Sequence, residues 1–512
     1  MQNPQQTPHK KSLTKFLTIG FVGARLFSNG SGALAWSESE ISAKISDVIN
    51  RIRGQLDANE ELFAVSALAL GADTLFAEIV ARESILQEVI LPQRPDMFFN
   101  ADDFNQDLHA LDRARNLLNS ANVIEIRTAS DSEDRGVRFA ECTAEIVREC
   151  DVLIAVAKMN QPGRIGGTVE AINLARSLGK QVYAISLDDD LRIKESAGNI
   201  IHAHRHRQEI WRWRLVRDAT DPAKADKSEL DLLKDAASRE AKLHQFRFRL
   251  MAKLMILSHV AATAVAAWAL ARLWGGQHLA FFKVALIGLG LFLYWRIHHM
   301  HPQKKWVVAR ATSEVCRSVL ALRGFKTDLR FLRDYNLPGG SGLARTLHVL
   351  HLKELKTAAV SRQAFIHRYL KEHLGAQSKY YLSKAAEAKS QAKILDRSFL
   401  GFSLLSFVAA VGYWVLHPDP SIATSTEKLL FLFIPVVFPM IAAAAASWVA
   451  VLDLERRIDR YQEVARILSE YEARIRNAIS DEALRRLVKR TERLLLQEVM
   501  EWQSTQAHMR GH

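Results

Sequence analysis

The sequence predicts two parts of different fold class: an α/β part with a doubly wound parallel sheet, followed by an all-α part that spans a membrane. Strand-like and helix-like segments alternate over residues 14–190, which is typical of a parallel sheet with helices on both faces. Four long apolar stretches occur in the second half of the chain, and the first half has none of their length. Such stretches are long enough to cross a bilayer as helices.

The expected strands of the first half are short apolar runs, each followed by a turn and a helical pattern. They cover residues 16–22, 62–69, 88–91, 122–126, 150–156 and 181–187. In a doubly wound sheet, ligands bind at the carboxyl ends of the strands. Three of the expected strands lead into glycine-containing turns, so we expect these turns to lie together at one edge of the sheet.

The polar residues and glycines of these turns predict a site for a phosphate-bearing ligand. Glycine lets the backbone approach a phosphate closely, arginine pairs with phosphate oxygens, and a helix start favours an anion. We expect Thr168 to cap its helix while offering a hydroxyl, and Asp73 or Glu170 to accept from a ribose hydroxyl. The candidate ligand-binding residues are Gly20, Gly23, Arg25, Gly71, Asp73, Arg164, Gly166, Gly167, Thr168 and Glu170.

The four apolar stretches predict membrane spans over about 252–273, 279–296, 398–416 and 429–452. Lys283 lies near the start of the second, where its long side chain can reach the interface. Pro435 and Pro439 lie in the fourth, and spanning helices tolerate proline better than soluble ones. The alternative is that these stretches are buried core helices of a soluble domain.

Basic residues flank the outer ends of both span pairs, which predicts the orientation. Positive residues stay in the cytoplasm, so both short hairpin loops, residues 272–278 and 417–428, are expected outside. The termini and the α/β part are then cytoplasmic. The flanking basic residues are Arg247, Arg249, Lys253, Arg296, Lys304, Lys305, Lys389, Lys393, Arg397, Arg456, Arg457 and Arg460.

A weak internal repeat indicates that a two-span module is duplicated. LSHVAA at 257–262 corresponds to LSFVAA at 405–410, and SEVCR at 313–317 corresponds to QEVAR at 462–466. Chance matching of short strings is the alternative. The expected domains are residues 14–190 (ligand binding), 191–240 (basic linker), 241–325 (first module), 326–379 (cytosolic helical connector) and 380–505 (second module with cytosolic helices).

Composition restricts the partners. The net charge of +13 and a pI near 9.6 indicate an acidic partner: nucleic acid, anionic lipid or a phosphorylated small molecule. The three cysteines have no metal-ligand spacing, and we expect neither a metal nor a cofactor. The charged helices over 344–374 and 453–503 are either solvated faces packed on one another or contacts between copies of the chain.

Several phrases of the first half resemble the SLOG domain, a Rossmann-like superfamily that includes the LOG phosphoribohydrolases. They are IGFVGAR, SALALGADTLFAEIVAR, the LP after the next strand, and CDVLIAV followed by GGTVEAINLARSLGK. The duplicated two-span unit is similar to the SLATT module, a two-helix membrane effector found with SLOG proteins in bacterial conflict systems.

The two resemblances together imply an effector of antiviral defence in the bacterial inner membrane. Its SLOG-like domain would bind a nucleotide second messenger, of the cyclic ADP-ribose type or a cyclic oligonucleotide. Its spans would form an ion channel or disrupt the bilayer. The implied partners are the lipid bilayer, further copies of the chain and a neighbouring enzyme that makes the signal, without direct binding of nucleic acid.

Two departures from the LOG pattern argue against an enzyme, and no catalytic residue is assigned. LOG hydrolases carry PGGxGTxxE, whereas this chain has PGRIGGTVEA. A shift of one residue turns a helical side chain by about 100°, so Glu170 should not overlay the family's catalytic carboxylate. The histidine usual in the first turn is Ala24 here. The alternatives kept open are a membrane-anchored nucleotide hydrolase or glycosidase, and an anchor that recruits a partner.

Overall fold

The computed structural model places residues in two compact units, Met1–Leu233 with Leu329–Ala359 and Lys234–Asp328 with Val360–His512. Most of the predicted linker 191–240, and residues 273–276 and 417–423 of the two predicted hairpin loops, lie outside the residues that the structure describes. Those residues are 10–25, 36–100, 108–160, 164–196, 214–216, 227–272, 277–335, 337, 340–357, 360–416 and 424–508.

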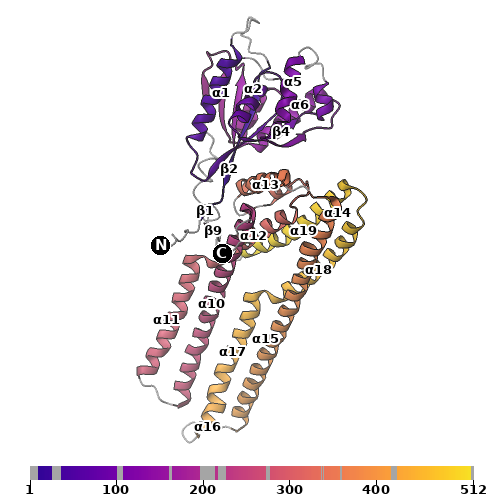
Figure 1. The fold of residues 1–512 in the computed structure, drawn as a ribbon. Helices are drawn as coiled ribbons and strands as arrows, with labels where there is room; N and C mark the ends of the chain where they lie inside the picture. The colour runs from indigo at the N-terminus through magenta and orange to yellow at the C-terminus, as the bar shows by residue number, and fades with distance from the viewer. Residues whose placement is uncertain are drawn as a thin grey trace, which may run out of the picture. The chain divides into compact units, whose positions relative to one another are not determined.

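The first unit contains a seven-stranded sheet in the order β5-β4-β3-β2-β6-β7-β8 (Figure 1). All neighbouring strands are parallel except β7 and the edge strand β8. The order reverses between β2 and β6, as in doubly wound sheets, so the predicted fold class is confirmed. The strands are β2 (Lys15–Gly23), β3 (Glu60–Ser66), β4 (Leu86–Leu91), β5 (Val123–Thr128), β6 (Val152–Ala157), β7 (Gln181–Ser186) and β8 (Ile193–Ser196), with a separate antiparallel pair, β1 (Lys10–Ser12) and β9 (Arg214–Val216).

Helices cover both faces of the sheet because their apolar residues recur at helical spacing. In α1, Ser37 and Glu40 form a capping box at the start, and Ile41, Ile45 and Val48 are buried against the sheet. α6 and α7 pack against β2, the central strand of the sheet, and against its neighbours. The helices of this unit are α1 (Glu38–Arg53), α2 (Ala72–Arg82), α3 (Pro95–Phe99), α5 (Leu108–Leu118), α6 (Arg135–Glu149), α7 (Thr168–Ser177) and α13 (Gly340–Thr357).

One helix of this unit comes from the predicted connector. α13 packs against β2 and β5, and Figure 1 shows it below the sheet. Its residues contact the amino ends of the strands: the Lys353 ammonium lies 4.9 Å from the centre of the Phe16 ring in β2, and His348 lies 3.1 Å from Glu125 in β5. The carboxyl ends of the strands are therefore at the opposite edge.

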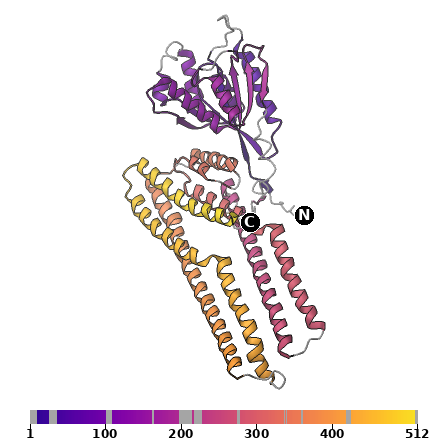
Figure 2. The same cartoon turned by 180° about the vertical axis from the view of Figure 1, so that it is seen from behind.

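The second unit is entirely helical among its described residues (Figure 2). It has four helices long and apolar enough to cross a membrane, at the positions predicted for the spans. Their large apolar side chains are exposed, for example Phe281, Leu400 and Trp414. The helices are α10 (Glu229–Arg272), α11 (Gln277–Met300), α12 (Pro302–Ala321), α14 (Arg362–Arg368), α15 (Gly375–Leu416), α16 (Ser425–Lys428), α17 (Ile434–Leu452), α18 (Leu454–Arg476) and α19 (Asp481–His508), with π-helical turns Tyr369–Leu374 and Leu429–Phe433.

The same order of elements occurs twice in this unit. A long helix that carries a basic segment and a span is followed by a second span and a more polar helix, as α10–α11–α12 and again as α15–α17–α18. Each second span passes into the helix that follows it through one residue with positive φ, His301 (47°) or Asp453 (51°). Non-glycine residues rarely adopt this conformation, so its recurrence agrees with a duplicated module.

Candidate functional site

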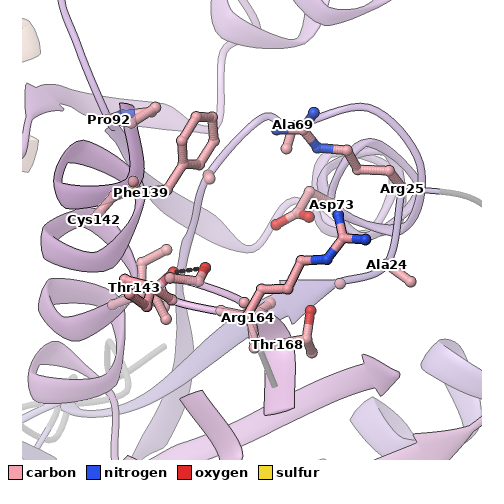
Figure 3. A pocket seen from close by; sticks show the side chains of 18 of the residues that line it. Ala24, Arg25, Ala69, Asp73, Pro92, Phe139, Cys142, Thr143, Arg164 and Thr168 are labelled. Carbon is pink, nitrogen blue, oxygen red and sulfur yellow. Dashed lines mark hydrogen bonds between the residues drawn. The ribbon is translucent and has the colours of Figure 1, made fainter. Parts of the chain in front are cut away.

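A cavity of about 540 Å³ opens at the carboxyl ends of the strands (Figure 3). It lies at the point where the strand order reverses, between β2 and β6, and α6 from Arg135 to Ile146 forms one wall. Its volume is in the range of small-molecule sites. The lining residues are Val22, Gly23, Ala24, Arg25, Ala67, Ala69, Asp73, Pro92, Phe98, Arg135, Gly136, Phe139, Cys142, Thr143, Ile146, Arg164, Ile165, Gly166, Gly167 and Thr168.

Seven of the ten residues predicted for the site line this cavity, and three do not. The seven are Gly23, Arg25, Asp73, Arg164, Gly166, Gly167 and Thr168. Gly20 has a packing role, since a Cβ there would lie 2.6 Å from Cβ of Cys150. Gly71 adopts φ +92°, and a Cβ there would lie 2.5 Å from the carbonyl oxygen of Arg25. The third residue is Glu170, whose side chain supports the turn before α7.

The turn before α7 is held from two sides. Gly166 adopts φ +74°, its N–H donates to Glu170 Oε2 at 2.6 Å, and its carbonyl accepts from Thr143 Oγ1 at 3.0 Å. Gly167 is the N-cap, and no side chain caps the helix. The expectation that Thr168 caps α7 was therefore wrong. Thr168 is the first helical residue, one position too late to accept from the N2 or N3 amide.

Asp73 is the buried acidic group of the cavity. It is only 4% exposed. Burial raises its pKa well above the usual value, although a hydrogen bond from the backbone of Gly23 and the charge of Arg25 act in the opposite direction. A carboxyl group with a raised pKa keeps its proton to higher pH, so it can donate a hydrogen bond and reduces the negative charge that an anionic ligand would meet.

Three arginines from three different elements surround the cavity, and an aromatic ring lies beside two of them. The guanidinium carbon of Arg25 is 5.2 Å, and that of Arg135 5.7 Å, from the centre of the Phe139 ring. Arg164 comes from the turn before α7, and Figure 3 shows Arg25, Arg164 and Asp73 around one space. One guanidinium group can donate two parallel hydrogen bonds to two oxygens of a phosphate. The arrangement can therefore hold a ligand with more than one anionic oxygen.

Sequence reasoning missed Arg135 and Phe139. The available signal was Asp134, which is the N-cap of α6 and whose Oδ1 accepts from the N–H of Val137 at 2.9 Å. An acidic N-cap after the strand β5 marks another helix that begins at the carboxyl edge of the sheet. The arginine directly after it is then placed at that edge.

A group of residues outside the cavity has the composition of a possible metal site. Ligand atoms of Glu88, Glu125 and His348 lie within 4.8 Å of one another. The guanidinium of Arg330 contacts both carboxylates, and Arg127 contacts Glu88 at 2.9 Å. The negative charge at this place is thus already paired with arginine, and a metal cation would have to compete with it.

Comparison with known families identifies the C-terminal part. Residues 369–502 match the model of SLATT_1, the SMODS and SLOG-associating 2TM effector domain 1. This part is similar to a SLATT membrane effector. The match contains the spans in α15 and α17 and the helices that follow them, and together with the four apolar helices it indicates a membrane protein. A search of the curated proteins finds no match.

Proposed function

We propose that the chain is a membrane effector in which a phosphate-bearing nucleotide binds the cavity of the α/β unit and changes the permeability of the membrane. The observation that carries this proposal is the convergence of Arg25, Arg135 and Arg164 on one cavity. Arg25 follows β2, Arg135 is the first residue of α6 and Arg164 lies in the turn before α7, and phosphate recognition accounts for three cations at one carboxyl edge. The open amino terminus of α7 faces the same cavity and adds backbone donors.

The SLATT_1 match supports the second half of the proposal, because that family is described as a two-span effector associated with SLOG domains. We therefore propose a role in bacterial defence, with a second messenger of the cyclic ADP-ribose type or a cyclic oligonucleotide as the ligand, made by a neighbouring enzyme. We also propose that several copies assemble in the inner membrane, with the α/β unit and both termini in the cytoplasm.

Binding without cleavage is supported by the position of Glu170. A glycosidic bond would need a carboxylate at the reacting atoms, whereas the Glu170 carboxylate accepts from the N–H of Gly166 and is not part of the cavity lining. Asp73 lines the cavity, but its raised pKa disfavours the ionised form that a nucleophile or general base needs.

The experiment uses the full chain in lipid nanodiscs and a panel of cyclic ADP-ribose, ADP-ribose, cyclic di-AMP and cyclic tri-AMP. Titration calorimetry measures binding, and dye release from liposomes measures permeability. Losing one charged phosphate contact costs about 1.5–3 kcal/mol, so Arg164→Gln should weaken binding roughly ten- to a hundredfold, as should Arg25→Gln.

The matched control is Arg53→Gln, which removes an exposed arginine of the same unit that pairs with Glu83 at 2.5 Å, away from the cavity. It should bind like the unchanged protein, because exposed ion pairs contribute little. Equal binding by all three variants would place the nucleotide elsewhere. Conversion of the nucleotide, without dye release, would favour the hydrolase instead.

A further inference from the structure

The segment between the two pairs of spans belongs, by its contacts, to the α/β unit. Leu329–Ala359 forms one compact body with Met1–Leu233, whereas the residues before and after it belong to the other unit. It contains the short 3-10 helix η2 (Arg330–Asp334) and the helix α13. We call this segment, residues 329–359, the strap. The chain therefore leaves the membrane unit, folds onto the sheet and returns before the second pair of spans.

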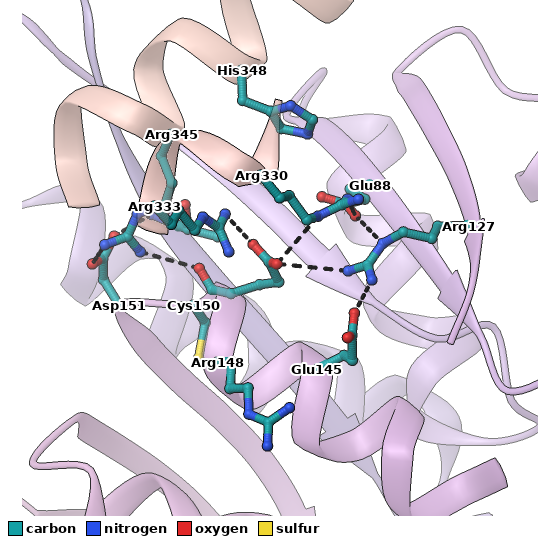
Figure 4. Close-up of polar contacts among 12 residues, drawn as sticks. Glu88, Arg127, Glu145, Arg148, Cys150, Asp151, Arg330, Arg333, Arg345 and His348 are labelled. Carbon is teal, nitrogen blue, oxygen red and sulfur yellow. Dashed lines mark hydrogen bonds and ion pairs between the residues drawn. The ribbon is translucent and has the colours of Figure 1, made fainter. Parts of the chain in front are cut away.

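The strap is held by a buried cluster of arginines and carboxylates (Figure 4). The Arg330 guanidinium contacts Glu88 of β4 and lies 3.2 Å from Glu125 Oε2 of β5. Its Nε lies 3.3 Å from Glu149 Oε1, within ion-pair distance but without hydrogen-bond geometry. The side chains of Glu88 and Glu149 are only 1% and 7% exposed. Arg330 thus joins three carboxylates from separate elements of the sheet unit.

Three more side chains of the strap complete this contact. Arg333 pairs with Glu149. Arg345 Nη2 lies 2.5 Å from Asp151 Oδ1, and its Nη1 donates to the Glu149 carbonyl at 3.1 Å. His348 Nε2 lies 3.1 Å from Glu125 Oε2. Removing one partner from a buried ion pair leaves an uncompensated charge and is strongly destabilising, so the strap is docked in one specific register.

The helix α6 connects this contact with the ligand cavity. Residues of α6 from Arg135 to Ile146 line the cavity, and Glu149 is the last residue of this helix. At 1.5 Å per residue, its fifteen residues span about 22 Å. Glu145 of the same helix pairs with Arg127, which also contacts Glu88. A shift of α6 therefore changes the groups that hold Arg330 and Arg333.

We propose that a ligand in the cavity shifts α6 and that this shift moves the strap. The movement of the strap is then transmitted along the chain to the spans on either side. The cavity lies at the carboxyl edge of the sheet and the strap at the amino edge, and α6 extends from one to the other. The chain continues from the strap to α12 on one side and to α14 on the other. The inference rests on the proposed function for the identity of what fills the cavity, but the mechanical connection does not depend on it.

The first test is hydrogen–deuterium exchange of the full chain in nanodiscs, without any nucleotide. The variants are Arg333→Gln and, as a milder change that keeps the charge, Arg333→Lys. We expect Arg333→Gln to accelerate exchange by about tenfold or more in both helix α13 of the strap (340–357) and α6 (135–149). Arg333→Lys should cause a smaller acceleration in the same two segments.

The matched control is Lys353→Gln. Lys353 is a half-exposed cation on the same helix α13 and lies 3.7 Å from Glu61. The Lys353→Gln variant should leave hydrogen exchange in α6 unchanged. Acceleration confined to the strap in Arg333→Gln, with α6 unaffected, would contradict the connection even if the strap itself is loosened.

The second test measures dye release from liposomes containing the full chain, with cyclic ADP-ribose and cyclic di-AMP as probes. We expect the Arg333→Gln variant to bind whichever probe causes dye release from the unchanged protein. Dye release by the variant should, however, be the same in the presence and in the absence of that probe. A probe response equal to that of the unchanged protein would overturn the proposal. If the unchanged protein binds no probe of the wider panel, the proposed function fails, whereas the exchange test still decides whether strap and α6 are connected.

Discussion

The carboxylate of Glu170 accepts a hydrogen bond of 2.6 Å from the backbone N–H of Gly166, four residues earlier in the chain. The glycine turn before α7 is thus held by a side chain of the helix that it precedes. This relationship gives Glu170 a supporting position in the turn rather than a place in the cavity lining.

We therefore predict that Glu170→Gln changes nucleotide binding by less than about tenfold, because the amide oxygen of glutamine can still accept from Gly166 and each such hydrogen bond contributes about 1 kcal/mol. Glu170→Ala leaves the N–H without this acceptor and should weaken binding more. Calorimetry with the panel compounds measures both. A catalytic Glu170 would instead abolish turnover in Glu170→Gln while binding persisted.

The buried carboxyl of Asp73 predicts a stability that depends on pH. Its pKa is raised in the folded chain, whereas an unfolded aspartate titrates near pH ~3.9. Above that pH the folded state binds more protons than the unfolded one, so this group lowers stability as pH rises. Asp73→Asn removes the effect, and its thermal midpoint should exceed that of the unchanged protein by more at pH 7 than at pH 4. A difference that does not vary with pH would contradict the raised pKa.

The carboxylates that hold the strap predict the opposite dependence at low pH. Burial alone would raise the pKa of Glu149, but the hydrogen bond and charge of Arg333 and the charges of Arg330 and Arg127 lower it to about 2. For Glu125, burial likewise opposes His348, Arg330 and Arg127, and the pKa again falls to about 2. Their contribution is complete above the unfolded value of ~4.3 and is lost as pH falls toward 2.

We expect the thermal midpoint of the α/β unit to fall between pH 5 and pH 3, and to fall less in Glu149→Gln, which has no proton to take up at this position. Differential scanning of the full chain measures both. An equal loss in the two proteins would show that Glu149 does not contribute to the acid sensitivity.

The orientation of the spans is tested by cysteine labelling of intact cells. Cysteines introduced at Gly275 and Ser421, between the spans of each pair, should react with an impermeant thiol reagent from outside, whereas one at Ser341 should not. The native Cys142, Cys150 and Cys316 are buried, so their background reaction should be low. Labelling of the cysteine at position 341, without labelling at positions 275 and 421, would indicate the opposite orientation of the spans.

Local patterns in the sequence were enough to predict the fold class and the spans. Apolar runs and amphipathic helices are determined by residues close together in the chain. The structure contains the corresponding strands, β2 to β7, and helices, α1 to α7. The spans depend on length and apolar content alone. Seven of the ten residues predicted for a ligand site line the cavity, because the carboxyl ends of parallel strands meet at one edge of the sheet.

The tertiary structure alone decided the remaining features. The Glu170 carboxylate accepts from the N–H of Gly166, whereas Thr168 lines the cavity, and no periodicity of the sequence distinguishes the two positions. Nothing in the local sequence distinguishes Arg330, Arg333 and Arg345 from solvated arginines. In the fold they pair with carboxylates more than 180 residues away in the chain, namely Glu88, Glu149 and Asp151. Ion pairs of this kind cannot be predicted from a short stretch of sequence. The attraction between opposite charges depends on their distance in space and not on their separation along the chain.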